Sequence, residues 1–220
     1  MLLAWSGGKD AAWALHVVRE AGCEVVALLT TLDHRDSVSA MQGVPLEILR
    51  AQAALAGLPL LESWQPHAAD NTTHVQCLAA TLAIARTRWP ALRAIAFGDL
   101  ALEDIRDWRE ATCAALGWQA HFPSFGRDTA TLAAEMVGAG MVAQVCCVDT
   151  DQLGRRWLGH PYDAGLLATL PEGVDRCGER GEFHTCITAG PMFDGSLVVE
   201  GTPAAGNDRF ARMALRLRAG

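Results

Sequence analysis

A short apolar run is followed at once by a glycine-rich turn and then by a helical pattern. Residues 1–5 (MLLAW) read as a buried strand, and Ser6-Gly7-Gly8-Lys9-Asp10 comes directly after them. Apolar side chains recur at helical spacing over residues 10–21, and Gly22 is a typical helix stop. Glycines let a backbone turn its N–H groups toward an anion, and a helix N-terminus adds its positive dipole end. Together with the Lys9 charge, this strand–loop–helix unit predicts a binding loop for a polyphosphate.

The spacing within the loop separates it from two common phosphate loops. It has neither the four-residue gap and Gly-Lys-Ser/Thr ending of a Walker loop nor a Gly-x-Gly-x-x-Gly fingerprint. Ser-Gly-Gly-Lys-Asp resembles instead the PP-loop of the N-type ATP pyrophosphatases, which cleave ATP between the α- and β-phosphates. That loop usually continues with Ser or Thr, whereas Ala11 stands here, so one hydroxyl ligand for phosphate is missing. The alternative interpretation is a glycine-rich turn without a ligand.

Strand and helix patterns alternate through the first half of the chain. Helices are expected at residues 45–56, from Asn71 or Thr72 (as N-cap) to Pro90, and at 104–116, and further strands at 24–31, 58–64, 94–97 and 118–122. Such alternation predicts an α/β, Rossmann-like nucleotide-binding domain with a parallel sheet and helices on both faces. Ligands of these folds bind outside the carboxyl ends of the strands.

Polar residues follow several of these predicted strands. After the loop at Ser6–Asp10 come Thr31 and Asp33, and later Gly98-Asp99, so we expect all of them to meet at one crevice. Asp33 fits a helix-capping role as well as a nucleotide role. Asp99 is the better candidate, because Gly98 lets the chain approach a ligand closely.

The second half of the chain has a different texture. A helix is expected over residues 126–140, a strand over 141–148, and a closing strand with a basic outer face over 210–218. Between them, a glycine-rich loop carries acidic and imidazole groups just before and at the start of a strand at 183–189; they are Asp175, Glu179, Glu182 and His184. These groups suit metal binding, acid–base chemistry or the binding of ammonium, and the alternative is a charged turn.

Composition excludes several classes of protein. No apolar run is long enough to span a membrane, and a net charge of −7 argues against broad nucleic-acid binding. The seven cysteines form no Cys-x-x-Cys pair, so we expect reduced thiols and a cytoplasmic protein. The missing pair also argues against the sulfur-inserting PP-loop enzymes that modify tRNA.

One segment makes the resemblance more specific. The run Cys177-Gly-Glu-Arg-Gly-Glu-Phe-His-Thr185, together with Ser6–Asp10 and Gly98-Asp99, is similar to the diphthine–ammonia ligase family. The resemblance implies a PP-loop domain at 1–122 and a smaller α+β domain at 123–220 that closes over the site. It also implies ATP-dependent amidation of the diphthine carboxyl group on elongation factor 2, with release of AMP and pyrophosphate. His160 stands where the family usually has Arg, so a different carboxylate acceptor is an open alternative.

On this interpretation the site residues have distinct roles. ATP lies on Ser6, Gly7, Gly8, Lys9, Asp10, Thr31 and Gly98, and Mg²⁺ is held by Asp10 and Asp99. Lys9 and Asp99 serve the phosphate chemistry, and Glu179, Glu182 or His184 binds ammonium and takes its proton. Two other functions stay open, a tRNA-modifying PP-loop enzyme and an adenine-nucleotide sensor without turnover. The oligomeric state is open as well, with a homodimer as one option.

Overall fold

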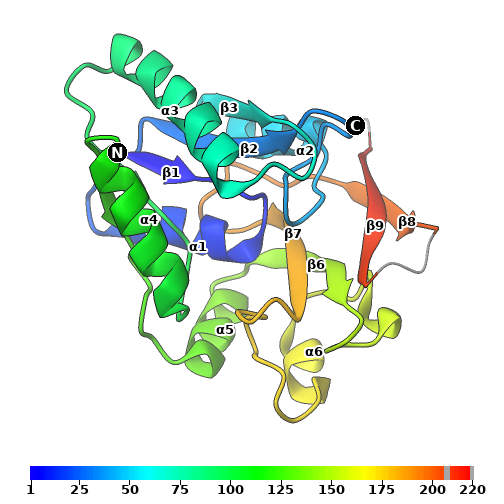
Figure 1. Cartoon of the computed structure of the whole chain (residues 1–220). Helices are drawn as coiled ribbons and strands as arrows, with labels where there is room; N and C mark the ends of the chain where they lie inside the picture. Colours follow the sequence, from blue (N-terminus) through cyan, green and yellow to red (C-terminus); the bar gives the residue numbers. More distant parts are fainter. Residues whose placement is uncertain (206–208, 219–220) are drawn as a thin grey trace.

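The chain builds two sheets of opposite character (Figure 1). The computed structural model describes residues 1–205 and 209–218, and in them one sheet has five parallel strands and the other four antiparallel strands. The parallel strands are β1 (Leu2–Ala4), β2 (Ala27–Asp33), β3 (Leu60–Gln65), β4 (Ala94–Ala96) and β5 (Gln119–His121), in the order β3-β2-β1-β4-β5. This confirms the predicted α/β fold, with β1 at the centre of its sheet.

Helices cover both faces of the parallel sheet, because alternate residues of each buried strand face opposite sides. The helices are α1 (Lys9–Glu20), α2 (Leu46–Leu55), α3 (Asn71–Arg88) and α4 (Glu103–Ala115). Leu3 and Leu28 pack in the core shared with α1 and α2, whereas Leu2 and Leu29 pack with residues of α3 and α4. Two apolar layers therefore enclose this sheet.

The antiparallel sheet packs against the face that carries α1 and α2. Its strands are β6 (Val142–Asp149), β7 (Phe183–Ala189), β8 (Val199–Pro203) and β9 (Phe210–Leu217), in the order β7-β6-β9-β8. Helix α5 (Thr129–Gly138), a 3₁₀ turn η1 (Arg155–Trp157) and α6 (Ala164–Thr169) accompany them. Phe183 and Ile187 of β7 belong to the same apolar core as α1 and α2, so a continuous core joins the two sheets.

Several local predictions need correction. The N-cap of α3 is Asp70, whose carboxylate accepts from Thr73 N, and not Asn71 or Thr72, because a carboxylate there serves the free N–H groups of the first turn. The second strand runs over 27–33 and not 24–31, so Asp33 is its last residue. The short elements β8 and α6 were not predicted, since five or six residues carry little periodicity.

Candidate active site

The two glycines of the loop between β1 and α1 are needed for different reasons, and only Gly7 has the left-handed backbone. Gly7 has φ +83°, and a Cβ there would lie 2.7 Å from Leu49 Cδ2, so only glycine fits. Gly8 has an ordinary negative φ, but a Cβ on it would lie 3.0 Å from the carbonyl oxygen of Thr185. Gly8 N donates to Ser6 Oγ at 3.3 Å. The second glycine thus allows close approach of β7.

Strand β7 and helix α2 support this loop from behind. Gly7 O accepts from Ile187 N at 2.9 Å and from Gln52 Nε2 at 3.1 Å, and Lys9 N donates to Thr185 Oγ1 at 3.1 Å. Sequence reasoning did not identify Gln52 or Thr185, because they lie 45 and 176 residues from their loop partners. The sequence offered one signal for each: Gln52 is a polar residue on the apolar face of a helix, and Thr185 is a polar residue within an apolar strand.

The Lys9 side chain points into the protein, toward the loop that precedes β7. Its exposed fraction is 1%, and Nζ donates to Asp10 Oδ2 at 2.9 Å and to the Cys177 carbonyl oxygen. Nζ also lies 5.3 Å from the ring centroids of both Tyr162 and Phe183. Burial opposes the charged form, but the charge and hydrogen bond of Asp10, with contributions from Cys177 and Glu179, together outweigh it and raise the pKa of Lys9 above its usual value. Lys9 is therefore a buried charged residue whose side chain links the loop to the segment that precedes the second sheet's strand β7.

Two of the predicted carboxylates lie near the Lys9 side chain. Asp10 retains an exposed side-chain fraction of 32%, and burial raises its pKa against the effect of Lys9, with the charges of Asp175 and Asp99 adding to the rise. Asp99 pairs with Arg109, whose Nε lies 2.7 Å from Oδ2. The ends of β1 and β4 therefore bring Asp10 and Asp99 to one region, as expected for a parallel sheet.

Glu179 links the second sheet's loop to the segment after β4. Its Oε1 accepts from Leu100 N at 2.8 Å and from Ala101 N at 2.9 Å, and burial raises its pKa. Gly98, two residues before Leu100, is a glycine because another part of the protein packs against it. A Cβ at this position would lie 2.7 Å from the carbonyl carbon of Asp10. The close approach predicted for Gly98 is thus made by the first turn of α1.

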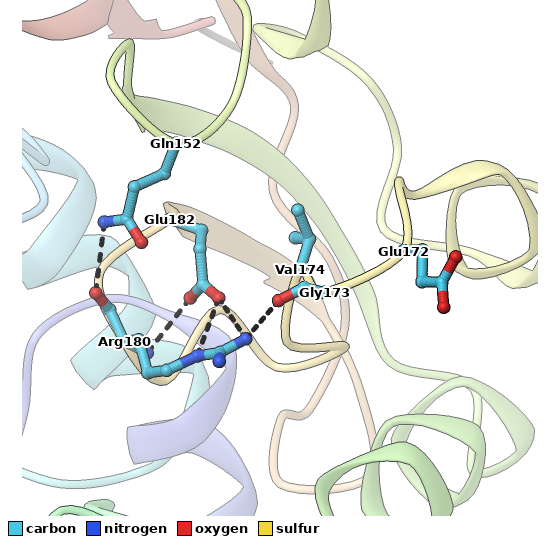
Figure 2. Close-up of a pocket in the computed structure, with 6 residues that line it drawn as sticks. All are labelled: Gln152, Glu172, Gly173, Val174, Arg180 and Glu182. Atoms are coloured by element: carbon cyan, nitrogen blue, oxygen red, sulfur yellow. Dashed lines mark hydrogen bonds and ion pairs between the residues drawn. The ribbon is translucent and has the colours of Figure 1, made fainter.

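Glu182 is committed to contacts within its own loop. It is 2% exposed and accepts from Asp175 N at 2.9 Å and Arg180 N at 3.0 Å, and Arg180 Nη2 lies 2.9 Å from its Oε1. Figure 2 shows the bonds between Glu182 and Arg180 at the wall of a hollow of about 320 Å³. Its lining residues are Gln152, Glu172, Gly173, Val174, Arg180 and Glu182.

His184, the second residue of β7, is a neutral imidazole at physiological pH. Burial lowers its pKa to about 4, and the nearby positive charges of Lys9 and Arg212 act in the same direction. A neutral imidazole is able to accept a proton, but two neighbouring cations oppose its charging. His184 is therefore a weak base in this site.

The end of β2 is held by local contacts. Thr31 O accepts from Ala40 N at 3.3 Å, and Asp33 Oδ1 accepts from Arg35 N at 2.8 Å. Asp33 Oδ2 lies 2.6 Å from His67 Nδ1, and the bond to His67 holds the pKa of Asp33 below its usual range. Asp33 thus closes the turn that follows β2 and does not make the helix cap that the sequence suggested, because the next helix begins only at Leu46. Thr31 lies within β2, near the carboxyl end of that strand.

The acidic residues at the loop offer one position that fits a metal ion. Within residues 1–205 and 209–218, no three or more His, Cys, Asp or Glu side chains are grouped to hold one. Magnesium bound with nucleotide needs only one or two carboxylates in addition to phosphate oxygens. In the same residues Asp10 Oδ1 is buried without a hydrogen-bond partner, which suits a cation beside the loop. Asp10 thus fits such an ion better than Asp99, which already faces Arg109.

A parallel α/β sheet with this glycine loop between β1 and α1, backed by a second sheet, defines a nucleotide-binding protein of the PP-loop class. Residues 1–120 match the family model described as the diphthamide synthase N-terminal domain, and residues 128–208 match that of its C-terminal domain. The chain therefore belongs to the diphthamide synthase family, whose chemistry is of the PP-loop ATP pyrophosphatase type and uses ATP. A search of curated proteins finds no match.

The structure also describes the state of the cysteines and the character of the helices. All seven cysteines lie in the described part of the chain and are free thiols. Among the helices of the described residues, none combines the length and the apolar character needed to span a bilayer.

Proposed function

We propose that the protein is an ATP-dependent, amide-forming ligase that adenylates a carboxylate and then aminates it with ammonia. Its proposed acceptor is the diphthine side chain of elongation factor 2, and its proposed compartment is the cytoplasm. One observation carries the proposal: the phosphate loop and the acidic loop before β7 are joined through Lys9, which contacts Asp10 and the Cys177 carbonyl. Nucleotide and acceptor chemistry would thus share one site.

The phosphate groups would lie on the exposed side of the loop, opposite β7. The Gly7 amide and the N–H groups of the helix α1 N-terminus beyond Lys9 would supply donors there, and the Ser6 hydroxyl can donate to a phosphate oxygen while accepting from Gly8 N. Lys9 adds its positive charge from below, without leaving its buried contacts. We assign Thr31 and the Gly98 segment to the nucleotide's other contacts at the same sheet edge.

A divalent cation fits beside Asp10, and Asp99 is the second carboxylate within reach of the charges there. When bound, Mg²⁺ would neutralise charge on the phosphate oxygens. Asp10 would hold this ion through its unpartnered Oδ1, while Lys9 keeps the carboxylate in place.

The proposed reaction has two steps. An oxygen of the acceptor carboxylate attacks the α-phosphorus of ATP, the bond to the β-phosphate oxygen breaks, and pyrophosphate leaves. Ammonia then attacks the acyl carbon, its nitrogen gives up one proton to solvent, and AMP leaves with the former carboxylate oxygen. Before this step a base must take one proton from ammonium, and we assign that role to Glu179, because burial raises its pKa and Oε1 alone takes the backbone bonds. Glu182 shapes the loop, and His184 stays neutral beside it.

The experiment measures AMP, pyrophosphate and amide with ATP, ammonium and elongation factor 2 that carries diphthine. We expect all three products from the wild-type protein. Glu179→Gln should keep ATP–pyrophosphate exchange and slow amide formation, whereas the control Glu172→Gln, on an exposed side chain, should change neither step. Equal loss of both steps in Glu179→Gln would refute its assignment. A wild-type protein that binds ATP but forms no AMP with any carboxylate would refute the ligase and favour a nucleotide sensor.

A further inference from the structure

Gln52, on helix α2, is a fully buried polar residue beneath the phosphate loop. Its exposed fraction is 0%, and its side-chain amide makes three hydrogen bonds to nitrogen or oxygen partners and a longer one, at 3.9 Å, to Cys186 Sγ. Trp5 Nε1 donates to Gln52 Oε1 at 2.9 Å, and Gln52 Nε2 donates to Gly7 O at 3.1 Å and to Ile187 O at 2.8 Å. An indole N–H only donates and a carbonyl only accepts, so these partners fix which end of the amide is nitrogen.

These bonds set the direction of one peptide group in the phosphate loop. The carbonyl of Gly7 is held by two donors, Gln52 Nε2 and Ile187 N. No cis peptide bond occurs in the described residues, and in a trans peptide the carbonyl and the following N–H point in opposite directions. Holding the Gly7 carbonyl toward α2 and β7 therefore aims the Gly8 N–H at the other side, where it meets Ser6 Oγ.

We propose that Gln52 is a positioning residue for ATP, which holds the Gly7–Gly8 peptide so that the Gly8 N–H binds Ser6 Oγ and orients that hydroxyl toward the triphosphate. Gln52 touches no ligand itself. The inference rests on the proposed binding of ATP at this loop. Because Gly7 has a positive φ and no side chain, its peptide has a wide range of alternative orientations, and the two donors select one of them.

A glutamine is better suited to this position than its close analogues. Glutamate has the same shape, but it would place an acceptor oxygen against two carbonyl oxygens, those of Gly7 and Ile187, and so favour a rotated peptide. Methionine fills the space without repulsion, but it leaves the Gly7 carbonyl with the Ile187 donor alone. The two substitutions should thus have graded effects on the loop.

The test compares Gln52→Glu and Gln52→Met with a matched control, Trp5→Phe, which removes the third bond of Gln52 and leaves its bonds to Gly7 and Ile187. Calorimetry gives the dissociation constants of ATP and of adenosine, and urea unfolding gives the stability of each variant. We expect Gln52→Glu to weaken ATP on the order of tenfold, the value of one hydrogen bond to a charged group, with a smaller loss in Gln52→Met. Affinity for adenosine, which has no phosphate, should not change.

The control separates positioning from general stability. Trp5→Phe should lower the unfolding midpoint and keep ATP affinity within about twofold. The reason is that Trp5 bonds the oxygen of the Gln52 amide, whereas the loop is held by its nitrogen. Folded Gln52 variants with wild-type ATP affinity, or with equal losses for ATP and adenosine, would refute the positioning role. If Gln52→Glu does not fold, Gln52→Met decides by the same criteria. A wild-type protein that binds no ATP would instead refute the proposed function.

Discussion

Removal of the Lys9 ammonium tests whether this group is a buried structural contact or a phosphate ligand. Lys9→Met keeps the length of the side chain but leaves Asp10 and the Cys177 carbonyl without their partner. Loss of one member of a buried ion pair costs about 3–5 kcal/mol, and the one-third exposure of Asp10 places the expected cost at the lower end, about 3 kcal/mol. For a chain of this size that lowers the melting temperature by about 6–12 °C.

The assay is thermal and urea unfolding of the protein without nucleotide. Asp10→Asn and the double variant complete a cycle, in which the double variant should lose less stability than the two single losses together, because the pair is coupled. The reasoning would be refuted by a Lys9→Met protein that has wild-type stability but binds no ATP. That result would put the ammonium on the phosphates, as the sequence alone suggested.

Two further perturbations follow from the same structure. The pKa of His184 is about 4 in the folded chain against 6.5 ordinarily, so below pH 6.5 the unfolded state binds a proton that the folded state does not. Stability should therefore fall as the pH drops from about 6.5 to about 4, by up to ~3 kcal/mol in urea titrations, and His184→Gln should flatten this dependence; an equally steep profile in that variant would contradict the assignment. Gly98→Ala places a Cβ 2.7 Å from backbone that cannot yield and should cost about 1–3 kcal/mol of unfolding free energy. The control Gly138→Ala, in open space at the end of α5, should be neutral or stabilising, and equal effects of the two would show that the contact is not tight.

The fold was accessible from the sequence because its signals are local. The apolar run, glycine loop and helix pattern of residues 1–22 predict the strand–loop–helix unit, and alternation in the first half predicts the parallel sheet. Gly7 takes the positive φ that a glycine-rich turn allows, whereas Gly8 keeps a negative φ and is needed for its close approach to Thr185. Short elements such as α6 escaped, since a six-residue helix has less than two turns of periodicity.

The site was accessible only in part, because tertiary contacts decide which way a side chain points. The sequence predicted that Lys9 holds phosphate, but its ammonium is buried against the carbonyl of Cys177, which lies 168 residues further along the chain. Gln52 reads as an ordinary helix residue until β7 packs beside it. Glu182 looked like a free carboxylate, and only the fold of its loop shows that Arg180 engages it.

The most direct test of the proposed chemistry follows one oxygen atom. Elongation factor 2 with ¹⁸O in the diphthine carboxylate is incubated with ATP, ammonium and the protein, and the AMP and pyrophosphate are analysed by mass spectrometry. Attack of the carboxylate on the α-phosphorus predicts that ¹⁸O appears in AMP, one atom for each amide formed, and never in pyrophosphate. Amide formation with unlabelled AMP, or with ADP and phosphate as products, would contradict an acyl-adenylate intermediate.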